Sequence, residues 1–405
     1  TVSASVKTVA VVGETNGLGN DALKAMLTVD TGDVIDNAHT TGTIHWSFNS
    51  GSEAFNYLAK GETLTLTYTV AATDSQSAEA TQEVVVTITG TNDNPTVEKA
   101  ITSSTTDKAN SYDLDLLAYA HDVDAKDILS VDSITYKVDN TPVAGIPQGL
   151  TLAGHTLTID PQNDAIRSLA EGETKTFELS YSVKDNQGGA VAQKATITVT
   201  GTNDAPVLDI AKTTLTGSVT EDAVTNKATG ALVGTDIDHN AVVTWSLVGT
   251  PDTTYGTFAV QNGDAPSWTY TLDNSKDAVQ ALAEGQTVTL TYTVQVADQY
   301  GLYDQHDITI EVKGTNDAPE IGVVGTDRAA AGLTETNAGL TTSGTLSVKD
   351  VDVTDTVSAS VKTVAVVGET NGLGNDALKA MLTVDAGQVI DGTHTTGTIH
   401  WSFNS

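Results

Sequence analysis

The sequence contains no cysteine among its 405 residues. Disulfides and thiolate metal sites are therefore excluded, which fits either a reducing compartment or a secreted protein that is stabilised in another way. Only 5% of the residues are aromatic, and no apolar run approaches the roughly 20 residues of a membrane-spanning helix. The residues after Thr1 do not form a signal peptide. We expect a soluble piece that begins inside a longer array.

Positive charge is also scarce, with 19 Lys and Arg against 52 Asp and Glu, a net charge of −33 and a pI near 4.2. This balance opposes binding to nucleic acid or to anionic membrane surfaces. The excess negative charges also repel one another within a folded array unless cations neutralise them. Carboxylate and carbonyl oxygens are ligands that suit Ca²⁺. A solvated acidic surface explains the composition equally well.

A repeated hexapeptide organises the chain. Gly-Thr-Asn-Asp-Ala-Pro occurs at 201–206 and 314–319, and Gly-Thr-Asn-Asp-Asn-Pro occurs at 90–95. Each copy follows an alternating apolar run and ends in Pro, which cannot donate to a sheet ladder and keeps the chain extended. Because the intervals of 111 and 113 residues match the size of one domain, the hexapeptide predicts a joint between modules.

The two ends of the chain are nearly identical. Residues 1–50 return at 356–405 with four differences, which are Thr31/Ala386, Asp33/Gln388, Asn37/Gly392 and Ala38/Thr393. We interpret this as recent duplication in a tandem array that was cut out of phase. The predicted modules are 1–91 (opening part missing), 92–202, 203–315 and 316–405 (closing part missing). Residues 316–355 of one molecule could then complete 1–90 of another, which predicts end-to-end self-association.

The same landmarks recur within each module. A short helical segment (53–58, 164–169, 277–282) leads into an acidic turn (59–62, 170–173, 283–286). A strand of period two follows, then an Asp (Asp74, Asp185, Asp298), and then the last strand before the joint. The Tyr of the period-two strand (Tyr68, Tyr181, Tyr292) is expected in the core. About seven short strands per module predict an all-β chain of tandem Ig-like sandwiches arranged end to end.

Acidic residues recur at three places in each repeat. These are the acidic turn, the Asn-Asp of the joint and an Asp-x-Asp knot about thirty residues further on (122–127, 236–240, 350–355). Ca²⁺ requires six to eight oxygens at about 2.3–2.6 Å, more than one turn supplies. Two acidic turns facing each other across the Asn-Asp linker could supply them. For a single Asn-Asp before Pro, turn hydrogen bonds are a sufficient explanation.

Together these residues resemble a known family. The hexapeptide closing a β module of about 110 residues, with Asp-Val-Asp about thirty residues on, is similar to the VCBS-type repeats of large RTX adhesins, in their extender region. The arrangement is also similar to cadherins, whose linkers bind Ca²⁺. The resemblance implies these Ca²⁺ ligands: Glu62, Asn92, Asp93, Asp122 and Asp124 at the first joint; Glu171, Glu173, Asn203, Asp204, Asp236 and Asp238 at the second; Glu284, Asn316, Asp317, Asp350 and Asp352 at the third.

The joints differ from one another. Lys60 stands where the second joint has Glu171, and Gln286 stands where it has Glu173, so we expect the second joint to bind ions most tightly. The nonapeptide Gly/Asp repeats of RTX proteins are absent from this sequence. The expectation that the protein is secreted therefore depends on the resemblance alone.

The sequence gives no support for an enzyme. Its eight His are scattered, and no His-Glu-x-x-His, Gly-x-Ser-x-Gly or phosphate-binding loop occurs. We expect a Ca²⁺-rigidified spacer of a bacterial cell-surface adhesin in attachment or biofilm formation. Its partners would be the neighbouring repeats, without nucleic acid and without membrane insertion. The alternative is a set of glycan- or protein-binding modules of a secreted protein. Tryptophan or tyrosine clusters shared by every module would favour that alternative.

Overall fold

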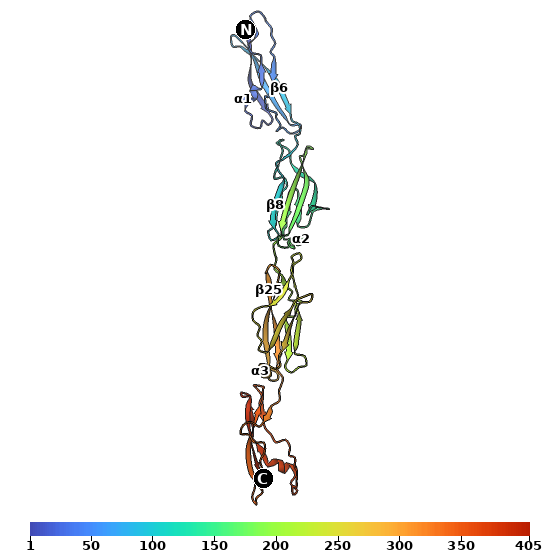
Figure 1. The fold of residues 1–405 in the computed structure, drawn as a ribbon. Coiled ribbons are helices and arrows are strands. Elements are labelled where there is room, and N and C mark those ends of the chain that lie inside the picture. Colours follow the sequence, from blue (N-terminus) through green and yellow to red (C-terminus); the bar gives the residue numbers. More distant parts are fainter. The chain divides into compact units, whose positions relative to one another are not determined.

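The computed structural model describes residues 1–405, and its regular elements are almost all β-strands (Figure 1). Its four helices have four to six residues, and none has the length and apolar character needed to cross a membrane. Buried apolar side chains form four separate cores, one inside each predicted module. The chain divides into two units, Thr1–Asn203 and Asp204–Ser405. The module boundaries themselves stay a prediction.

Residues 1–91 form an antiparallel sheet in the order β3-β1-β5-β6 and a second sheet of β2 and β4. The elements are β1 (Val2–Val12), α1 (Asn20–Ala25), β2 (Leu27–Val29), β3 (Asp33–Ile35), β4 (Trp46–Phe48), β5 (Thr63–Asp74) and β6 (Glu79–Thr89). Alternate residues of β5 face the core, because successive side chains of a strand point to opposite sides. Leu64, Leu66 and Tyr68 are fully buried, as the period-two pattern predicts.

The helix expected at 53–58 is absent. Residues 53–55 have no regular structure and 56–57 form a turn, and Phe55 adopts a φ of +55°, which an α-helix does not accommodate. A helix lies instead at α1, directly after the loop at 17–19.

Residues 92–202 form the sheets β12-β11-β15-β16-β8, β13-β14-β9 and β10-β7. The elements are β7 (Thr96–Val97), β8 (Ile101–Thr106), β9 (Tyr112–Asp115), β10 (Ala120–His121), β11 (Ser130–Val138), β12 (Thr141–Val143), β13 (Leu150–Ala153), β14 (Thr156–Ile159), α2 (Asp164–Arg167), β15 (Thr174–Lys184) and β16 (Ala190–Thr200). The helix expected here is confirmed as α2, and the Asn163 side chain caps it by accepting from the Ala165 amide at 3.1 Å. Strand β8 runs parallel to β16.

Residues 203–315 repeat this plan with the sheets β18-β25-β24-β21, β19-β23-β22 and β17-β20. The elements are β17 (Val207–Leu208), β18 (Thr216–Thr220), β19 (Lys227–Ala231), β20 (Gly234–Thr235), β21 (Thr244–Leu247), β22 (Gly256–Gln261), β23 (Ser267–Leu272), α3 (Asp277–Gln280), β24 (Thr287–Ala297) and β25 (Tyr303–Lys313). Strand β18 pairs in parallel with β25. Trp268, Tyr270 and Tyr292 are buried, and the burial of Tyr292 agrees with the core role expected for it.

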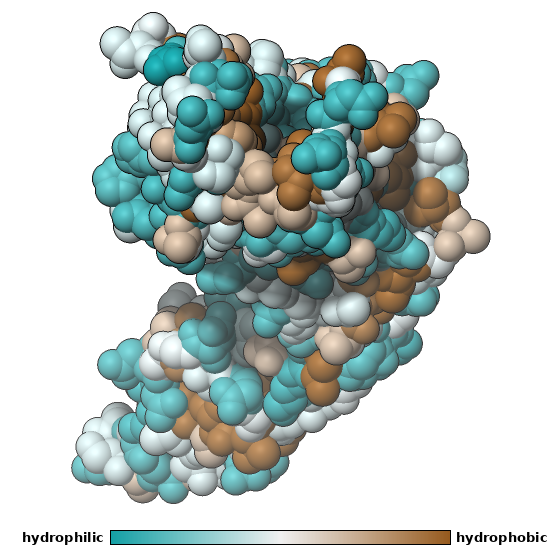
Figure 2. Space-filling model, turned by 90° about the horizontal axis from the view of Figure 1, so that it is seen from below, coloured by the Kyte–Doolittle hydropathy of each residue, from teal (hydrophilic) through white to brown (hydrophobic).

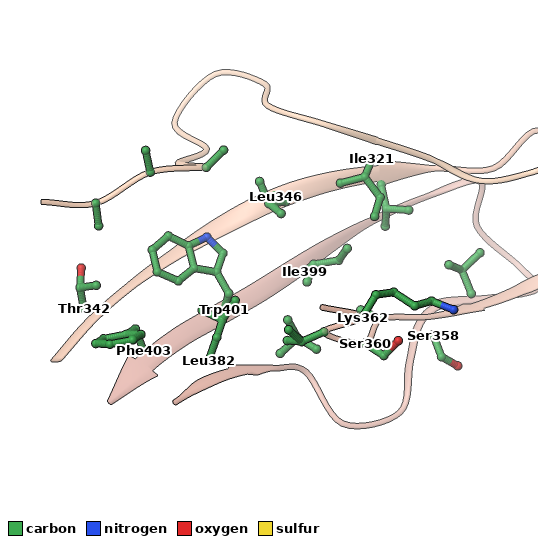
Figure 3. A pocket seen from close by; sticks show the side chains of 18 of the residues that line it. Ile321, Thr342, Leu346, Ser358, Ser360, Lys362, Leu382, Ile399, Trp401 and Phe403 are labelled. Carbon is green, nitrogen blue, oxygen red and sulfur yellow. The ribbon is translucent and has the colours of Figure 1, made fainter. Parts of the chain in front are cut away.

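Residues 316–405 form the sheets β26-β27-β31-β29 and β28-β30. The elements are β26 (Glu320–Gly322), β27 (Thr341–Lys349), β28 (Thr356–Ser358), α4 (Asn375–Ala380), β29 (Leu382–Val384), β30 (Gln388–Asp391) and β31 (Thr396–Asn404). A largely apolar groove of about 660 Å³ lies in this part. Leu346, Ile399 and Trp401 line it (Figure 3). On the face seen in Figure 2, hydrophilic side chains predominate and apolar ones form smaller patches.

Candidate metal centre

The Asp-x-Asp knot of residues 92–202 begins directly after β10. Asp122 Oδ1 accepts a hydrogen bond from the Asp124 amide at 3.0 Å, the side-chain turn that Asp favours. Asp124 Oδ2 in turn accepts from the Asp93 amide at 2.8 Å. The Asn-Asp part of the hexapeptide is therefore hydrogen-bonded directly to the knot.

Asp185 reaches the same place from the tight turn between β15 and β16. Its Oδ1 accepts from the amides of Gln187, Gly188 and Gly189 at 2.8, 2.6 and 2.8 Å. Its Oδ2 accepts from Asn92 Nδ2 at 3.0 Å. A Cβ at Gly189 would lie 2.2 Å from that same oxygen, so the turn needs glycine for this close approach.

Three carboxylates converge here, because ligand oxygens of Asp122, Asp127 and Asp185 all lie within 4.8 Å of one another. Several oxygens around them are buried and accept no hydrogen bond: Asn92 Oδ1, Asp122 Oδ2, Asp124 Oδ1 and both carboxylate oxygens of Asp127. Buried acceptors without donors are costly. An oxygen-only set of this kind fits a hard divalent cation such as Ca²⁺.

The charge state of the cluster follows from its crowding. Burial raises the pKa of Asp124 and of Asp127, and the neighbouring carboxylates Asp122 and Asp185 raise both further. Burial also opposes ionisation of Asp185, but the hydrogen bonds from Asn92 and the turn amides outweigh it and hold its pKa below the usual range. A bound cation would remove the repulsion that these carboxylates exert on one another.

Residues 204–405 contain two related arrangements. Asp238 Oδ2 accepts from the Asp204 amide at 2.9 Å, and Asp352 Oδ2 accepts from the Asp317 amide at 2.8 Å. The first Asp of each knot binds the amide of the second, Asp236 to Asp238 at 3.0 Å and Asp350 to Asp352 at 3.2 Å. Oxygens that are buried without a hydrogen bond recur at Asp236, Asp317 and Asp352. The knot is therefore the same local structure in all three places.

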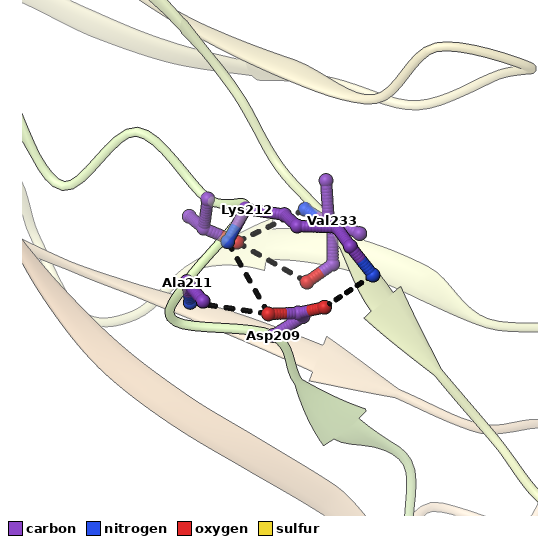
Figure 4. Close-up of polar contacts among 5 residues, drawn as sticks. Asp209, Ala211, Lys212 and Val233 are labelled. Atoms are coloured by element: carbon purple, nitrogen blue, oxygen red, sulfur yellow. Dashed lines mark hydrogen bonds and ion pairs between the residues drawn. The ribbon is translucent and has the colours of Figure 1, made fainter.

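The chain that leaves the second hexapeptide is fixed by a further turn (Figure 4). Asp209 Oδ1 accepts from the amides of Ala211 and Lys212 at 3.1 and 3.2 Å, and its Oδ2 pairs with Lys212 Nζ at 2.9 Å. The Asp209 amide donates to the Val233 carbonyl at 2.8 Å. Lys212 holds the pKa of Asp209 below its usual range, so this carboxylate serves the turn.

The predicted glutamates behave differently from the aspartates. Glu62 forms an ion pair with Lys126 and is not among the clustered carboxylates. Glu171 Oε2 accepts from the Asn203 amide at 2.7 Å, and Glu173 Oε2 accepts from the Ala170 amide at 2.9 Å. Glu284 is exposed. Asn316 Nδ2 donates to the Asp317 carbonyl at 2.9 Å. A ligand role for these residues stays a prediction.

Four acids at the joints were not assigned a role from the sequence: Asp107, Asp127, Asp185 and Glu221. Asp107 is buried and accepts from Thr202 Oγ1 at 2.7 Å. Glu221 is buried beside Asp317, accepts from the Thr315 amide at 3.2 Å, and burial raises its pKa to about 7. The recurrence of Asp at 185 and 298 could have indicated a role at the joint. Nothing in the sequence indicated one for Asp107, because its partner Thr202 lies 95 residues away in the chain.

Comparison with known proteins gives structural likeness only. No protein-family model and no curated protein matches the chain. Protocadherin Gamma B7 cadherin domains 1–4 match at 16% identity, covering 98% of this chain and 89% of that one, with a TM-score of 0.38. PcdhgB3 EC1-4 matches at 12% identity, with coverages of 98% and 88% and a TM-score of 0.36. The human Desmocollin-1 ectodomain matches at 10% identity, with coverages of 98% and 86% and a TM-score of 0.30. At these scores the likeness assigns no family.

Proposed function

We propose that this chain is a structural spacer whose β-sandwich modules are stiffened at their joints by Ca²⁺. The convergence of Asp122, Asp127 and Asp185, with buried oxygens that accept no hydrogen bond, carries the proposal. The net charge of −33 supports it, because a folded acidic array gains most from ions that neutralise it. Asp127 and Asp185 join the ligands predicted from the sequence at the first joint.

Binding of ions to the folded state would stabilise the modules by mass action. Extracellular Ca²⁺ modules bind with dissociation constants of roughly 10⁻⁴–10⁻³ M. At ten to a hundred times that concentration, each occupied site adds about 1.4–2.7 kcal/mol to the free energy of unfolding. The stability of the spacer would therefore follow the Ca²⁺ concentration outside the cell.

Calorimetric titration of the full chain with Ca²⁺, after removal of ions by a chelator, tests the proposal. Asp127→Asn removes one clustered carboxylate without a large change of shape, and we expect at least one class of sites to weaken by about tenfold, or about 1.4 kcal/mol. Asp164→Asn is the matched control, because the Asp164 side chain is 96% exposed in its ion pair with Arg167. Heat of binding that is absent, or unchanged in Asp127→Asn, would refute the site.

Small-angle scattering with Ca²⁺ and then with chelator tests the mechanical part. A stiff spacer keeps its maximum dimension when ions are bound and samples shorter conformations once they are removed. Equal scattering in both conditions would show that cations do not stiffen the chain, even if they bind.

The cellular setting is a separate part of the proposal. The repeated hexapeptide and knots support a VCBS-type extender of a bacterial surface adhesin, in which the spacer carries a distal binding domain away from the cell. Self-association, in which residues 316–355 complete residues 1–90 of a second copy, stays a prediction. Light scattering over a hundredfold range of concentration tests it, and a constant monomer mass would remove it.

A further inference from the structure

The last residue of each acidic turn uses one side-chain oxygen to close its own turn. That oxygen accepts from the amide three residues earlier: Ala59 to Glu62 at 3.2 Å, Ala170 to Glu173 at 2.9 Å and Ala283 to Gln286 at 3.3 Å. The shared bond fixes the side chain, so its second polar atom points in a defined direction. Glu and Gln differ only in that second atom, which is an acceptor in Glu and a donor in Gln.

At two joints the second atom reaches the following module. Glu62 Oε1 accepts from Lys126 Nζ, and Gln286 Nε2 donates to Thr354 Oγ1 at 3.1 Å. Lys126 and Thr354 hold equivalent places, each two residues after the second Asp of its knot. The roles of donor and acceptor are thus reversed between the two joints, and both pairs remain complementary.

A backbone contact lies beside the first pair. The Ala125 amide donates to the Tyr57 carbonyl at 3.2 Å, so the knot of residues 92–202 is bonded to residues 1–91 at two adjacent points. Neither bond involves a carboxylate of the Asp122, Asp127 and Asp185 cluster. The two modules are therefore in direct contact without any shared ion.

We propose that Glu62–Lys126 and Gln286–Thr354 are direct clasps between modules that act without cations and select which module docks on which. A mismatched neighbour would place two donors together, as Gln opposite Lys does, whereas the Thr hydroxyl can donate as well as accept and therefore tolerates either turn residue. Such mismatches discriminate between partners through repulsion and lost hydrogen bonds. At the first joint, the Lys126 ammonium neutralises the charge of Glu62 within the clasp.

Hydrogen exchange of the Ala125 amide, measured by NMR on the full chain in chelator, tests the clasp at the first joint. We expect Lys126→Glu and Glu62→Lys each to raise the exchange rate by about two- to fivefold, the range that an exposed ion pair supports. The double exchange of Glu62→Lys with Lys126→Glu restores the pair in reverse and should restore the rate. Because no Ca²⁺ is present, failure here is distinct from failure of the calcium proposal.

Two further variants sharpen the result. Lys137→Glu is the matched control, since Lys137 faces Glu178 between β11 and β15 and makes the same change of net charge away from the joint. Glu62→Gln with Lys126→Thr transplants the neutral pair of the third joint, and it should keep the protection while abolishing its dependence on salt. Single variants that leave Ala125 exchange unchanged, or a charge-reversed double variant that exchanges as fast as the singles, would overturn the proposal.

Discussion

Residues 1–50 and residues 356–405, here the first and second copy, have nearly the same sequence but form different strands. Val2–Val12 is one strand of eleven residues in the first copy, whereas its counterpart is a strand only at Thr356–Ser358. Conversely, Thr396–Asn404 is a strand of nine residues, whereas its counterpart is a strand only at Trp46–Phe48. The four substitutions lie at 31–38 of the first copy, outside both segments. Sequence differences therefore do not cause the change.

The cause lies in the partner strands. Strand β5 pairs with β1 from Val2↔Asp74 to Val12↔Thr65, and β27 pairs with β31 from Thr341↔Asn404 to Lys349↔Thr396. Each long strand exists where a neighbour supplies the ladder. The same residues with the same propensity form little sheet without that neighbour, because strand propensity mostly reflects packing against cross-strand partners.

Local elements are the same in both copies. Helices α1 and α4 occupy equivalent residues and end at equivalent caps, Met26 and Met381. Strands β2 and β29 are equivalent as well. The helices, whose hydrogen bonds close within a few residues, and the short strands, whose partners lie in the same copy, thus depend on the local sequence, and the long strands depend on context.

The largest expected difference between the copies is at Leu23 and Leu378. Leu23 is 0% exposed in the core with β5, whereas the equivalent Leu378 is only half-buried. Leu23→Ala should cost about 2–5 kcal/mol because it leaves a cavity, and Leu378→Ala should cost clearly less. Amide exchange in β5 and in β31 measures each loss in its own module, since a chain with several cores does not unfold as one unit. Equal losses would contradict the difference in packing.

A smaller difference is expected from Tyr68. Its hydroxyl donates to the Leu23 carbonyl at 2.7 Å in a buried position. Tyr68→Phe leaves that carbonyl without the bond and should cost about 1–2 kcal/mol, measured again by amide exchange in β5. Tyr181→Phe is the matched variant, because the Tyr181 hydroxyl donates to the Leu116 carbonyl at 2.8 Å. A negligible cost in Tyr68→Phe would show that β5 holds the first copy by apolar contact alone.

These comparisons show how far the sequence predicts the fold. The period-two strands, their buried tyrosines and the link between Asp93 and the knot follow from patterns repeated in register. The prediction of a helix at 53–58 was wrong, because a pattern of apolar residues does not reveal the positive φ of Phe55. The role of Asp185 was also missed, since the bond from Asn92 spans 93 residues and only tertiary structure brings the two together.

Substitution of the tryptophan should cost more stability in the second copy than in the first, which is the reverse of the order expected for the leucines. Trp401 Nε1 donates to the Arg328 carbonyl at 2.7 Å, and a Cβ at Gly344 would lie 2.6 Å from its ring. Trp46 is 50% exposed. We expect Trp401→Phe to cost about 0.5–1.5 kcal/mol for the lost hydrogen bond and Trp46→Phe to cost almost nothing. Acrylamide should quench Trp46 more strongly than Trp401, and the reverse order would contradict the two environments.

The smallest expected difference is between the titrations of the equivalent carboxyls Asp30 and Asp385. They test whether local contacts are independent of the partner strands. Each accepts, at 2.6 Å, the amide of the His that lies 15 residues later, His45 and His400 respectively, and lies close to its ring. These backbone bonds, with the His side chains, hold the pKa of both carboxyls below the usual range. Because the folded pKa is depressed, the stabilisation is present above the unfolded pKa and is lost as pH falls through the folded one. NMR titration of the carboxyl carbons should therefore give two matching curves. A clear separation between them would show that partner strands reach even into these short-range contacts.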